Sequence, residues 1–419
     1  MRSLSRGESW FKLVFFAFWA GSCSPQAPAE EPPTEAKPFA SAGDEEAEAS
    51  AEGPAAPSGR LWATETFSPR PGSVPDPDLE ELSDACGRGD AALHDVAAFV
   101  AQYQASHGDP PSLDEVNFEL KRRGSPYVMP RMWTATTSGV PKAELLGAVQ
   151  TWAKSRPARG QVRCGAASFD GAKERQLALL QVDVLAELAP LPTRVEAGVW
   201  LELEVGFLAP TTAASVVLLP PDGPPRTVNS TLEGTRARAR LSLATEGTWL
   251  IQVMATQEGG PLPIASALVT AGKQPPDAYD ARPVPGEKAF DASLNPGDAL
   301  FVLVNAARKE EGLPALKRNK TLDRAATMHS THMREQGRIS HDTGHGDPAK
   351  RVAQAGITPK ATGENVALAQ SVQRLHRALW ASPSHRENLL LRRWDEVGIG
   401  IVERADGALL ATELFIDSN

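Results

Sequence analysis

The sequence has no excess of basic residues. Its 419 residues include 43 lysines and arginines against 52 aspartates and glutamates, which gives a formal net charge of −9. A protein that binds nucleic acid in general shows a basic face. The composition therefore argues against a general nucleic-acid binder, although it is compatible with a local basic patch.

The sequence also lacks the common signatures of catalysis. It contains no Gly-x-Ser-x-Gly elbow, no His-Glu-x-x-His pair and no glycine-rich lysine loop of the kind that holds phosphate. These absences favour a non-catalytic protein and leave enzymatic activity as the weaker alternative.

Cysteine is scarce, with 3 in the chain, and the first of them ends an N-terminal targeting pattern. Arg2, Arg6 and Lys12 precede an apolar run at residues 13–20, which leads through Gly and Ser to Cys23. A positive start, a short apolar centre and small residues at the exit are typical of a signal peptide. The apolar run is too short for a transmembrane helix.

The end of this pattern, Ala20-Gly-Ser-Cys23, resembles a bacterial lipobox, in which the cysteine is acylated and becomes the mature N-terminus. Residues 1–23 are therefore predicted to be a lipoprotein-type signal peptide. A lipid on Cys23 would anchor the chain to a membrane surface without spanning the membrane. In the lipoprotein pattern, Ser24 indicates the outer membrane. The alternative is an ordinary cleaved signal peptide, with the protein in the periplasm, at the cell surface or secreted.

The other two cysteines, Cys86 and Cys164, flank one region of the sequence. An exported chain folds in an oxidising compartment, where such a pair can form a disulfide. Two free buried thiols are the alternative, and the sequence leaves both open.

Composition divides the chain before the C-terminal third into four parts. Residues 24–77 are rich in Pro, Ala and Glu and predict a disordered acidic tether. Residues 78–172 carry apolar side chains at helical spacing and predict a small helical domain. Residues 173–272 predict a β-sandwich, and residues 273–294, rich in Pro and charge, predict a linker.

The prediction of a sandwich depends on short runs rich in β-branched residues with turn residues between them. The stretch Gly247-Thr-Trp-Leu-Ile-Gln-Val253 resembles the penultimate strand of immunoglobulin-like domains, modules that usually space or bind. We expect strands at residues 177–184, 199–207, 214–219, 237–243, 248–255 and 264–270.

Residues 295–419 contain six of the 8 histidines. Asn295-Pro-Gly-Asp298 predicts a helix start, and a second helix is expected at residues 319–336. That helix carries His329 and His332, three residues apart on one side. The spacing allows the two imidazoles to lie together, but we favour the alternative in which one packs in the core and the other is solvated.

An ordered set of motifs in this region resembles the CAP superfamily, also called SCP-like or PR-1-like, in its bacterial form. Each motif alone is weak, but their order and separations are specific, and together they cover about the last third of the chain. The motifs are Leu303-Val-Asn-Ala-Ala-Arg-Lys-Glu-Glu-Gly-Leu-Pro-Ala-Leu316, Ser340-His341, Gly363-Glu-Asn-Val366, Trp380-Ala-Ser-Pro-Ser-His-Arg-Glu-Asn-Leu389 and Val397-Gly-Ile-Gly400.

The resemblance implies an α-β-α sandwich, with an antiparallel sheet between helices. It also implies a solvent-reachable cleft with two histidines and two acidic residues, which in some members holds a divalent metal such as zinc. By motif, His341, Glu364 and His385 correspond to three of these four residues. The fourth, counted from the helix tryptophan, falls on Pro383, so that carboxylate is missing.

These three side chains leave two alternatives open. His341, His385 and Glu364 could ligate zinc or another divalent metal, with His345 or Asp342 replacing the missing carboxylate. Alternatively, the three form a hydrogen-bonded structural cluster.

The sequence as a whole predicts a multidomain, exported and lipid-anchored cell-envelope protein. Its CAP-like cleft is expected to bind a lipid, another small molecule or a divalent metal, without catalytic machinery. One alternative is a metal-dependent or His/Glu-assisted, peptidase-like hydrolase of the cell envelope. A structural envelope protein with a vestigial cleft is the other.

Overall fold

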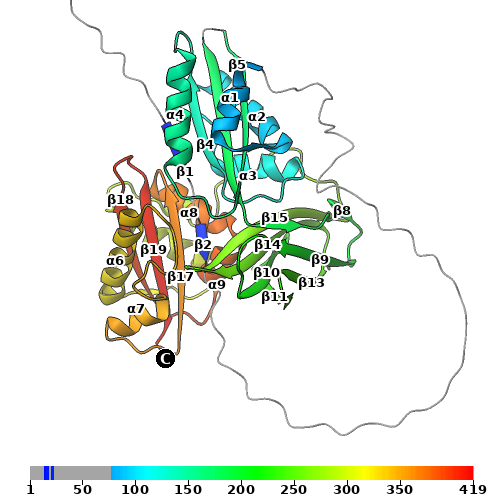
Figure 1. Cartoon of the computed structure of the whole chain (residues 1–419). Helices are drawn as coiled ribbons and strands as arrows, with labels where there is room; N and C mark the ends of the chain where they lie inside the picture. Colours follow the sequence, from blue (N-terminus) through cyan, green and yellow to red (C-terminus); the bar gives the residue numbers. More distant parts are fainter. Residues whose placement is uncertain (1–13, 18–19, 23–76, 173, 419) are drawn as a thin grey trace, which may run out of the picture.

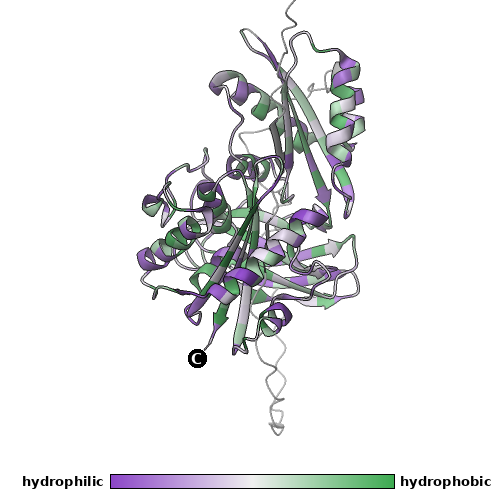
Figure 2. Cartoon of the chain, turned by 90° about the vertical axis from the view of Figure 1, so that its left-hand side faces the viewer, coloured by the Kyte–Doolittle hydropathy of each residue, from purple (hydrophilic) through white to green (hydrophobic). Residues whose placement is uncertain are grey.

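The computed structural model describes residues 14–17, 20–22, 77–172 and 174–418, which form three bodies that each contain at least one sheet (Figure 1). The predicted lipidation site, Cys23, and nearly all of the predicted tether lie outside the described residues. No helix within the described ranges is long and apolar enough to cross a membrane. Figure 2 shows mostly hydrophobic strands in the middle of the molecule.

Two short strands, β1 (Val14–Ala17) and β2 (Ala20–Ser22), fall within the predicted signal peptide. β1 pairs antiparallel with β4 (Arg131–Thr136) of the first body, and β2 pairs antiparallel with β17 (Ala361–Ala369) of the last. The signal peptide itself stays a prediction.

The first body corrects the prediction of a small helical domain at residues 78–172. It is a mixed α/β body with one sheet in the order β1-β4-β6-β5-β3. Its remaining elements are α1 (Pro77–Cys86), β3 (Arg88–Gly89), α2 (Ala91–His107), α3 (Leu113–Arg122), α4 (Lys142–Lys154), β5 (Gln161–Asp170) and β6 (Arg175–Val184).

The sequence pattern does not predict the strands of this body, because helices cover both faces of the sheet. Leu180 and Val182 of β6 pack with Val96 and other residues of α2, whereas Leu177 and Leu179 pack with Trp152 of α4 on the opposite face. A strand that is buried on both sides loses the alternation of polar and apolar residues. Residues 177–184, which we expected to form the first strand of the sandwich, instead lie in β6 of this sheet.

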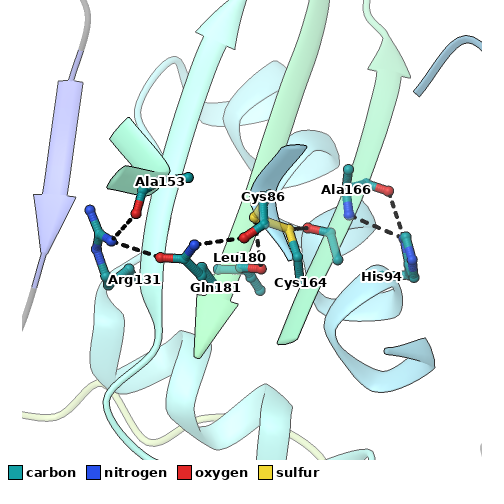
Figure 3. Close-up of a disulfide and its surroundings, with 9 residues drawn as sticks. Cys86, His94, Arg131, Ala153, Cys164, Ala166, Leu180 and Gln181 are labelled. Carbon is teal, nitrogen blue, oxygen red and sulfur yellow. Dashed lines mark hydrogen bonds between the residues drawn. A yellow bond between two sulfur atoms is a disulfide. The ribbon is translucent and has the colours of Figure 1, made fainter. Parts of the chain in front are cut away.

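A disulfide joins Cys86, at the end of α1, to Cys164 in β5 (Figure 3). Beside it, the Gln181 amide donates a 2.7 Å hydrogen bond to the Cys86 carbonyl and accepts one of 2.7 Å from Arg131. The cross-link closes a loop of 78 residues, and such a loop greatly restricts the unfolded chain. It therefore fixes α1 against the sheet.

The second body consists of two antiparallel-rich sheets around one shared core, which is the arrangement of a β-sandwich. One sheet has the order β11-β10-β14-β15-β8 and the other β12-β13-β9-β7. The immunoglobulin-like assignment stays a prediction. The strands are β7 (Ala186–Leu188), β8 (Arg194–Val195), β9 (Trp200–Phe207), β10 (Ala213–Leu219), β11 (Arg226–Asn229), β12 (Thr231–Glu233), β13 (Arg236–Ser242), β14 (Gly247–Gln257) and β15 (Gly260–Ala271).

The third body is built in three layers, as the resemblance implies. Its sheet has the order β16-β18-β19-β17-β2, and Figure 1 shows α6 and α7 on one side of it and α8 and α9 on the other. The elements are η1 (Glu287–Ala289), α5 (Pro296–Glu310), β16 (Lys317–Arg318), α6 (Lys320–Gln336), α7 (Pro348–Gln354), β17, α8 (Val372–Ala381), α9 (Pro383–Leu390), β18 (Glu396–Glu403) and β19 (Leu409–Asp417).

Two glycines of the Val397-Gly-Ile-Gly400 motif set the distance between β18 and α6. A Cβ atom on Gly398 would lie 2.3 Å from Leu322 of α6, and one on Gly400 would lie 2.1 Å from the backbone nitrogen of Thr327. Only glycine permits so close an approach. The helix that leads to His341 is thereby pressed directly onto the sheet that carries Glu364.

Candidate functional site

His341 lies in the loop between α6 and α7. Helix α6 ends at Gly337, which has the left-handed φ of 59°, and α7 begins behind the capping residue Asp347. Between them, the Asp342 carboxylate accepts hydrogen bonds from the backbone of Gly344 and Gly346, at 2.7 and 3.1 Å. Such local bonds are typical of Asp in turns, and here they fold the loop back toward the sheet.

The centre of the site is the Glu364 carboxylate on β17, which is fully buried. Its Oε1 accepts a 2.8 Å hydrogen bond from Nδ1 of His341, and its Oε2 accepts one of 2.7 Å from Nη2 of Arg351. Burial opposes ionisation of Glu364, but the Arg351 guanidinium and the histidines outweigh it and lower the pKa of this carboxyl to about 2. The carboxylate is thus an ionised group held in the core by a buried cation.

Arg351, on α7, connects this carboxylate to the loop. Its guanidinium also donates to the carbonyls of His341 and Gly346, at 3.0 and 3.1 Å. One side chain therefore fixes the position of the loop and neutralises Glu364. Nothing in the sequence around Arg351 distinguishes it from a surface arginine, and sequence analysis missed it.

His329 of α6 supports the same loop. Its Nε2 lies 2.8 Å from the Ser340 carbonyl and 3.8 Å from Oε1 of Glu364. Burial lowers the pKa of His329 to about 4, so that the imidazole is neutral and Nε2 donates to the carbonyl. His332 points elsewhere and stacks on His345, with 3.6 Å between the ring centroids. The two histidines of the helix therefore do not lie together.

Two asparagines, Asn365 from the motif of Glu364 and Asn388 from the motif of His385, connect the segments that carry these candidates. Asn365 donates to the His385 carbonyl at 3.2 Å, and Asn388 donates to the Glu364 carbonyl at 3.1 Å and to the Asn365 side chain at 3.0 Å. The structure thus brings the His341 and Glu364 side chains into direct contact, whereas this network reaches His385 at its backbone carbonyl.

A second buried carboxyl, Glu413 of β19, lies directly across from Asn365 in the β17–β19 ladder. Its Oε2 accepts a 3.0 Å hydrogen bond from Asn365, and burial raises the pKa of Glu413 to about 7. Sequence analysis missed this residue, although a lone glutamate inside the apolar run Ala408-Leu-Leu-Ala-Thr-Glu-Leu-Phe-Ile416 is a signal that could have revealed it.

The β14–β15 hairpin of the sandwich covers the His341 loop. The carbonyl of Gly259, at the tip, accepts hydrogen bonds from the backbone of His341 (3.0 Å) and Asp342 (3.1 Å) and from the Ser340 hydroxyl (2.9 Å). His341 is 2% exposed, and Glu364 and His385 are 0% exposed. The expectation of a solvent-reachable cleft at these residues is therefore wrong for this conformation, because a neighbouring domain closes it.

The residues do not fit a metal ion in this arrangement. Both oxygens of Glu364 already accept hydrogen bonds, and the positive charge of Arg351 beside them opposes a second cation. His345 stacks on His332, and Asp342 caps its own turn. Within the part of the chain that the structure describes, no group of three or more His, Cys, Asp and Glu residues has metal-site geometry.

The serines that precede the two candidate histidines are engaged away from a nucleophile's role. The Ser340 hydroxyl lies 2.9 Å from the Gly259 carbonyl and 2.7 Å from the Asp342 carbonyl. The Ser384 hydroxyl lies 3.3 Å from that of Ser382. Neither contact resembles activation of an oxygen by a general base, so these two serines do not support the hydrolase alternative.

Comparison with known proteins places the similarity in this body. The family model described as "Cysteine-rich secretory protein family", CAP, matches residues 301–414. The uncharacterized protein YkwD of Bacillus subtilis (strain 168) is 32% identical over 103 residues, which is 24% of this chain and 40% of that protein. The match thus covers less than half the length of this curated relative.

Two solved structures of low identity also match. An outer surface protein of Borrelia burgdorferi is 23% identical, with 30% of this chain and 93% of that chain covered and a TM-score of 0.29. An extracellular protein of Bacillus anthracis that contains an SCP domain is 18% identical, with 51% and 81% covered and a TM-score of 0.27.

The two buried glutamates provide a direct test of the charge on Glu364. Replacement Glu364→Gln removes the anion and leaves the Arg351 guanidinium buried without it, which should destabilise β17 by about 3–5 kcal/mol. The matched replacement Glu413→Gln at pH 5 should cost less than about 1 kcal/mol, because an amide resembles a carboxyl that is largely protonated. Native-state hydrogen exchange of the β17 amides in the full chain measures both opening free energies.

The sign of the pH dependence separates the two residues further. The pKa of Glu413 is raised in the folded state, so its contribution to stability is present below about pH 4.5 and is lost as the pH rises through 7. Relative to wild type, Glu413→Gln should therefore gain on the order of 2–3 kcal/mol between pH 5 and pH 8. Equal destabilisation by the two replacements, with no such trend, would contradict the assigned charges.

The hairpin cover can be tested at its tip. A Cβ atom on Gly259 would lie 2.4 Å from the Ser340 hydroxyl oxygen, whereas one on Gly223, with nearly the same positive φ (92° against 94°), meets nothing within 4 Å. Both Gly→Ala changes cost about 1–2 kcal/mol of backbone strain, but only Gly259→Ala should speed hydrogen exchange of the His341 and Asp342 amides, by tenfold or more. Similar exchange in both variants would show that the hairpin does not seal the loop.

Proposed function

Because residues 301–414 form a CAP-superfamily domain, we propose that this chain is a non-catalytic binding protein of the cell envelope. In this proposal, the CAP domain takes up a lipid or another small molecule beside His341. The helical and strand layers hold the site, and the sandwich hairpin closes it.

The observation that carries the proposal is that each of the two side chains hydrogen-bonded to the Glu364 carboxylate also has a buried polar atom without a partner. Nε2 of His341 and Nη1 of Arg351 are both buried, and neither has a hydrogen-bond partner among the described residues. Nearly all buried polar atoms in folded proteins are paired, since leaving one unpaired costs about 1–3 kcal/mol. Two such atoms around one carboxylate therefore support a site for a polar group.

The chemistry of these two atoms narrows the class of ligand. In the tautomer in which Nδ1 of His341 carries the proton and donates to Glu364, Nε2 is an acceptor, while Nη1 of Arg351 is a donor. A hydroxyl group can donate to the first and accept from the second. The proposal therefore favours a ligand that carries a hydroxyl group, such as a hydroxylated lipid, over a carboxylate or a metal ion.

Entry of a ligand requires the hairpin to move. The tip is held to the loop by one carbonyl, that of Gly259, through backbone and hydroxyl hydrogen bonds. Net contributions of about 1 kcal/mol for each such bond allow an open state to be populated as a minor fraction. A ligand that binds only the open state would then shift the equilibrium toward that state.

The membrane anchor is the second part of the proposal, and it depends on the lipobox-like Ala20-Gly-Ser-Cys23 alone. A lipid on this cysteine and a spacer rich in Pro, Ala and Glu would hold the three bodies near a membrane surface, where lipid ligands are available.

Metabolic labelling tests the anchor. Cells that express the full-length chain and are grown with labelled palmitate should yield a labelled protein, and the Cys23→Ala variant should carry no label. Cys86→Ala serves as the control, because Cys86 forms the disulfide with Cys164. An unlabelled wild-type protein would rule out the anchor without bearing on the CAP site.

A lipid-extract experiment tests the binding site. The purified mature chain is incubated with a total lipid extract of the producing cells, re-isolated and analysed by mass spectrometry. Wild type should retain a hydroxyl-bearing lipid, and His341→Ala should retain at least tenfold less. His376→Ala is the matched control, since His376 is also fully buried but hydrogen-bonds the Pro285 carbonyl. Equal retention by all three proteins, or none by wild type, would refute the proposal.

A further inference from the structure

A separate cavity of about 230 Å³ lies where the three bodies meet. Helix α3 of the first body, strands β14 and β15 of the sandwich, and the α8–α9 corner of the CAP domain form its walls. Ligand sites are frequent at domain interfaces. This one shares no lining residue with the His341 network, and its interpretation is independent of the function proposed above.

The walls of the cavity are mainly apolar. They include side chains from all three bodies, among them Leu113, Phe118, Leu250, Leu268 and Pro383. A cavity of about 150 Å³ with such walls is large enough for benzene. The present volume therefore suits a hydrocarbon or aryl group of roughly eight to ten non-hydrogen atoms.

One helix supplies both charged groups of the cavity. Asp114, Phe118 and Lys121 are spaced by four and three residues, so all three lie on the side of α3 that faces the cavity. Seven residues of helix separate the charges by about 10 Å along the axis. The cavity is thus polar at two ends, with a carboxyl at Asp114 and an amine at Lys121, and apolar in the middle.

Lys121 is the unusual member. It is 6% exposed, and its ammonium group donates to the backbone carbonyls of Ser125 (3.5 Å) and Tyr127. No carboxylate within the described ranges forms an ion pair with it, and burial lowers the pKa of Lys121 to about 7. With this pKa the amine is about half protonated at pH 7, and an anion delivered by a ligand would favour its charged form.

The backbone at the cavity is also strained. Met129, which lines it, has a φ of 54° and is the one non-glycine residue with positive φ in the part of the chain that the structure describes. Such strain persists where the surroundings hold it, and it is concentrated at binding sites.

We propose that this interdomain cavity binds a small amphipathic monocarboxylate, with the carboxylate on Lys121 and the hydrocarbon or aryl body between α3 and the sandwich strands. A single ammonium group, without an arginine fork beside it in the cavity lining, matches the charge of one carboxylate better than that of a phosphate. At the other end, the Asp114 carboxyl, whose charge Arg377 and Arg374 partly offset, disfavours a second anion and thereby directs the carboxylate to Lys121.

Because all three bodies contribute walls, a bound ligand would contact all three at once. Occupancy should therefore stabilise the assembled chain against interdomain opening, by linkage. This gives the cavity a measurable effect on the whole protein.

Octanoate and octanol are the probes, since they share a chain and differ in the carboxylate. Calorimetry on the full-length mature protein should show octanoate binding at least tenfold more tightly than octanol. The variant Lys121→Met should lose this preference. It should bind both probes with about the affinity that wild type has for octanol. Because methionine removes the amine and its hydrogen bonds to the Ser125 and Tyr127 carbonyls, the Tm of this variant is measured to verify that it folds.

Two further variants complete the test. Lys273→Met, at an exposed lysine of the linker that follows β15, should bind octanoate like wild type. Ala378→Phe fills the CAP-domain wall and should abolish binding of both probes while Lys121 is intact. Octanoate bound no better than octanol by wild type, equal binding by wild type and Lys121→Met, or no binding of either probe would overturn the proposal.

Discussion

The organisation of the C-terminal body depends on one buried ion pair, in which the Glu364 carboxylate is held between Arg351 and His341. An unpaired anion at this depth would cost several kcal/mol, so the loop from 338 to 346 and helix α7 must take the positions that pair it. The same contact orients the His341 ring. It thereby leaves Nε2 as the His341 nitrogen that a ligand could contact. Both Glu364 oxygens already accept hydrogen bonds.

The second constraint is the arrangement of the bodies around this pair. The sandwich reaches the CAP domain at the hairpin tip, through Gly259, and along β14, where Gln252 accepts from the backbone of Ser384 at 3.0 Å. The first body contributes α3 to the interdomain cavity. The sandwich therefore covers the site around His341 and Glu364. Together with the first body, it also forms the interdomain cavity, whose chemistry differs because its basic group is the Lys121 amine.

The sequence predicted the third body well because its signals are local or ordered: the cap at Asn295, the helix expected at residues 319–336 and the ordered set of motifs. It failed in the first body, where β6 is buried on both faces and shows no alternation. In the site, motifs identified His341 and Glu364, but Arg351 and Glu413 become meaningful only through tertiary contacts. No local pattern in Gly259 or its neighbours indicates that a hairpin from another domain covers His341.

The central claim is that Glu364 stays ionised in the core because Arg351 and His341 hold it. The most direct measurement is a pH titration of the ¹³C-labelled glutamate side chains by NMR, with the Glu364 signal assigned by its loss in Glu364→Gln. We expect the Glu364 carboxyl carbon to keep the shift of an ionised group down to about pH 3, in line with a pKa of about 2. Titration at or above the ordinary pKa of 4.5 would contradict the account.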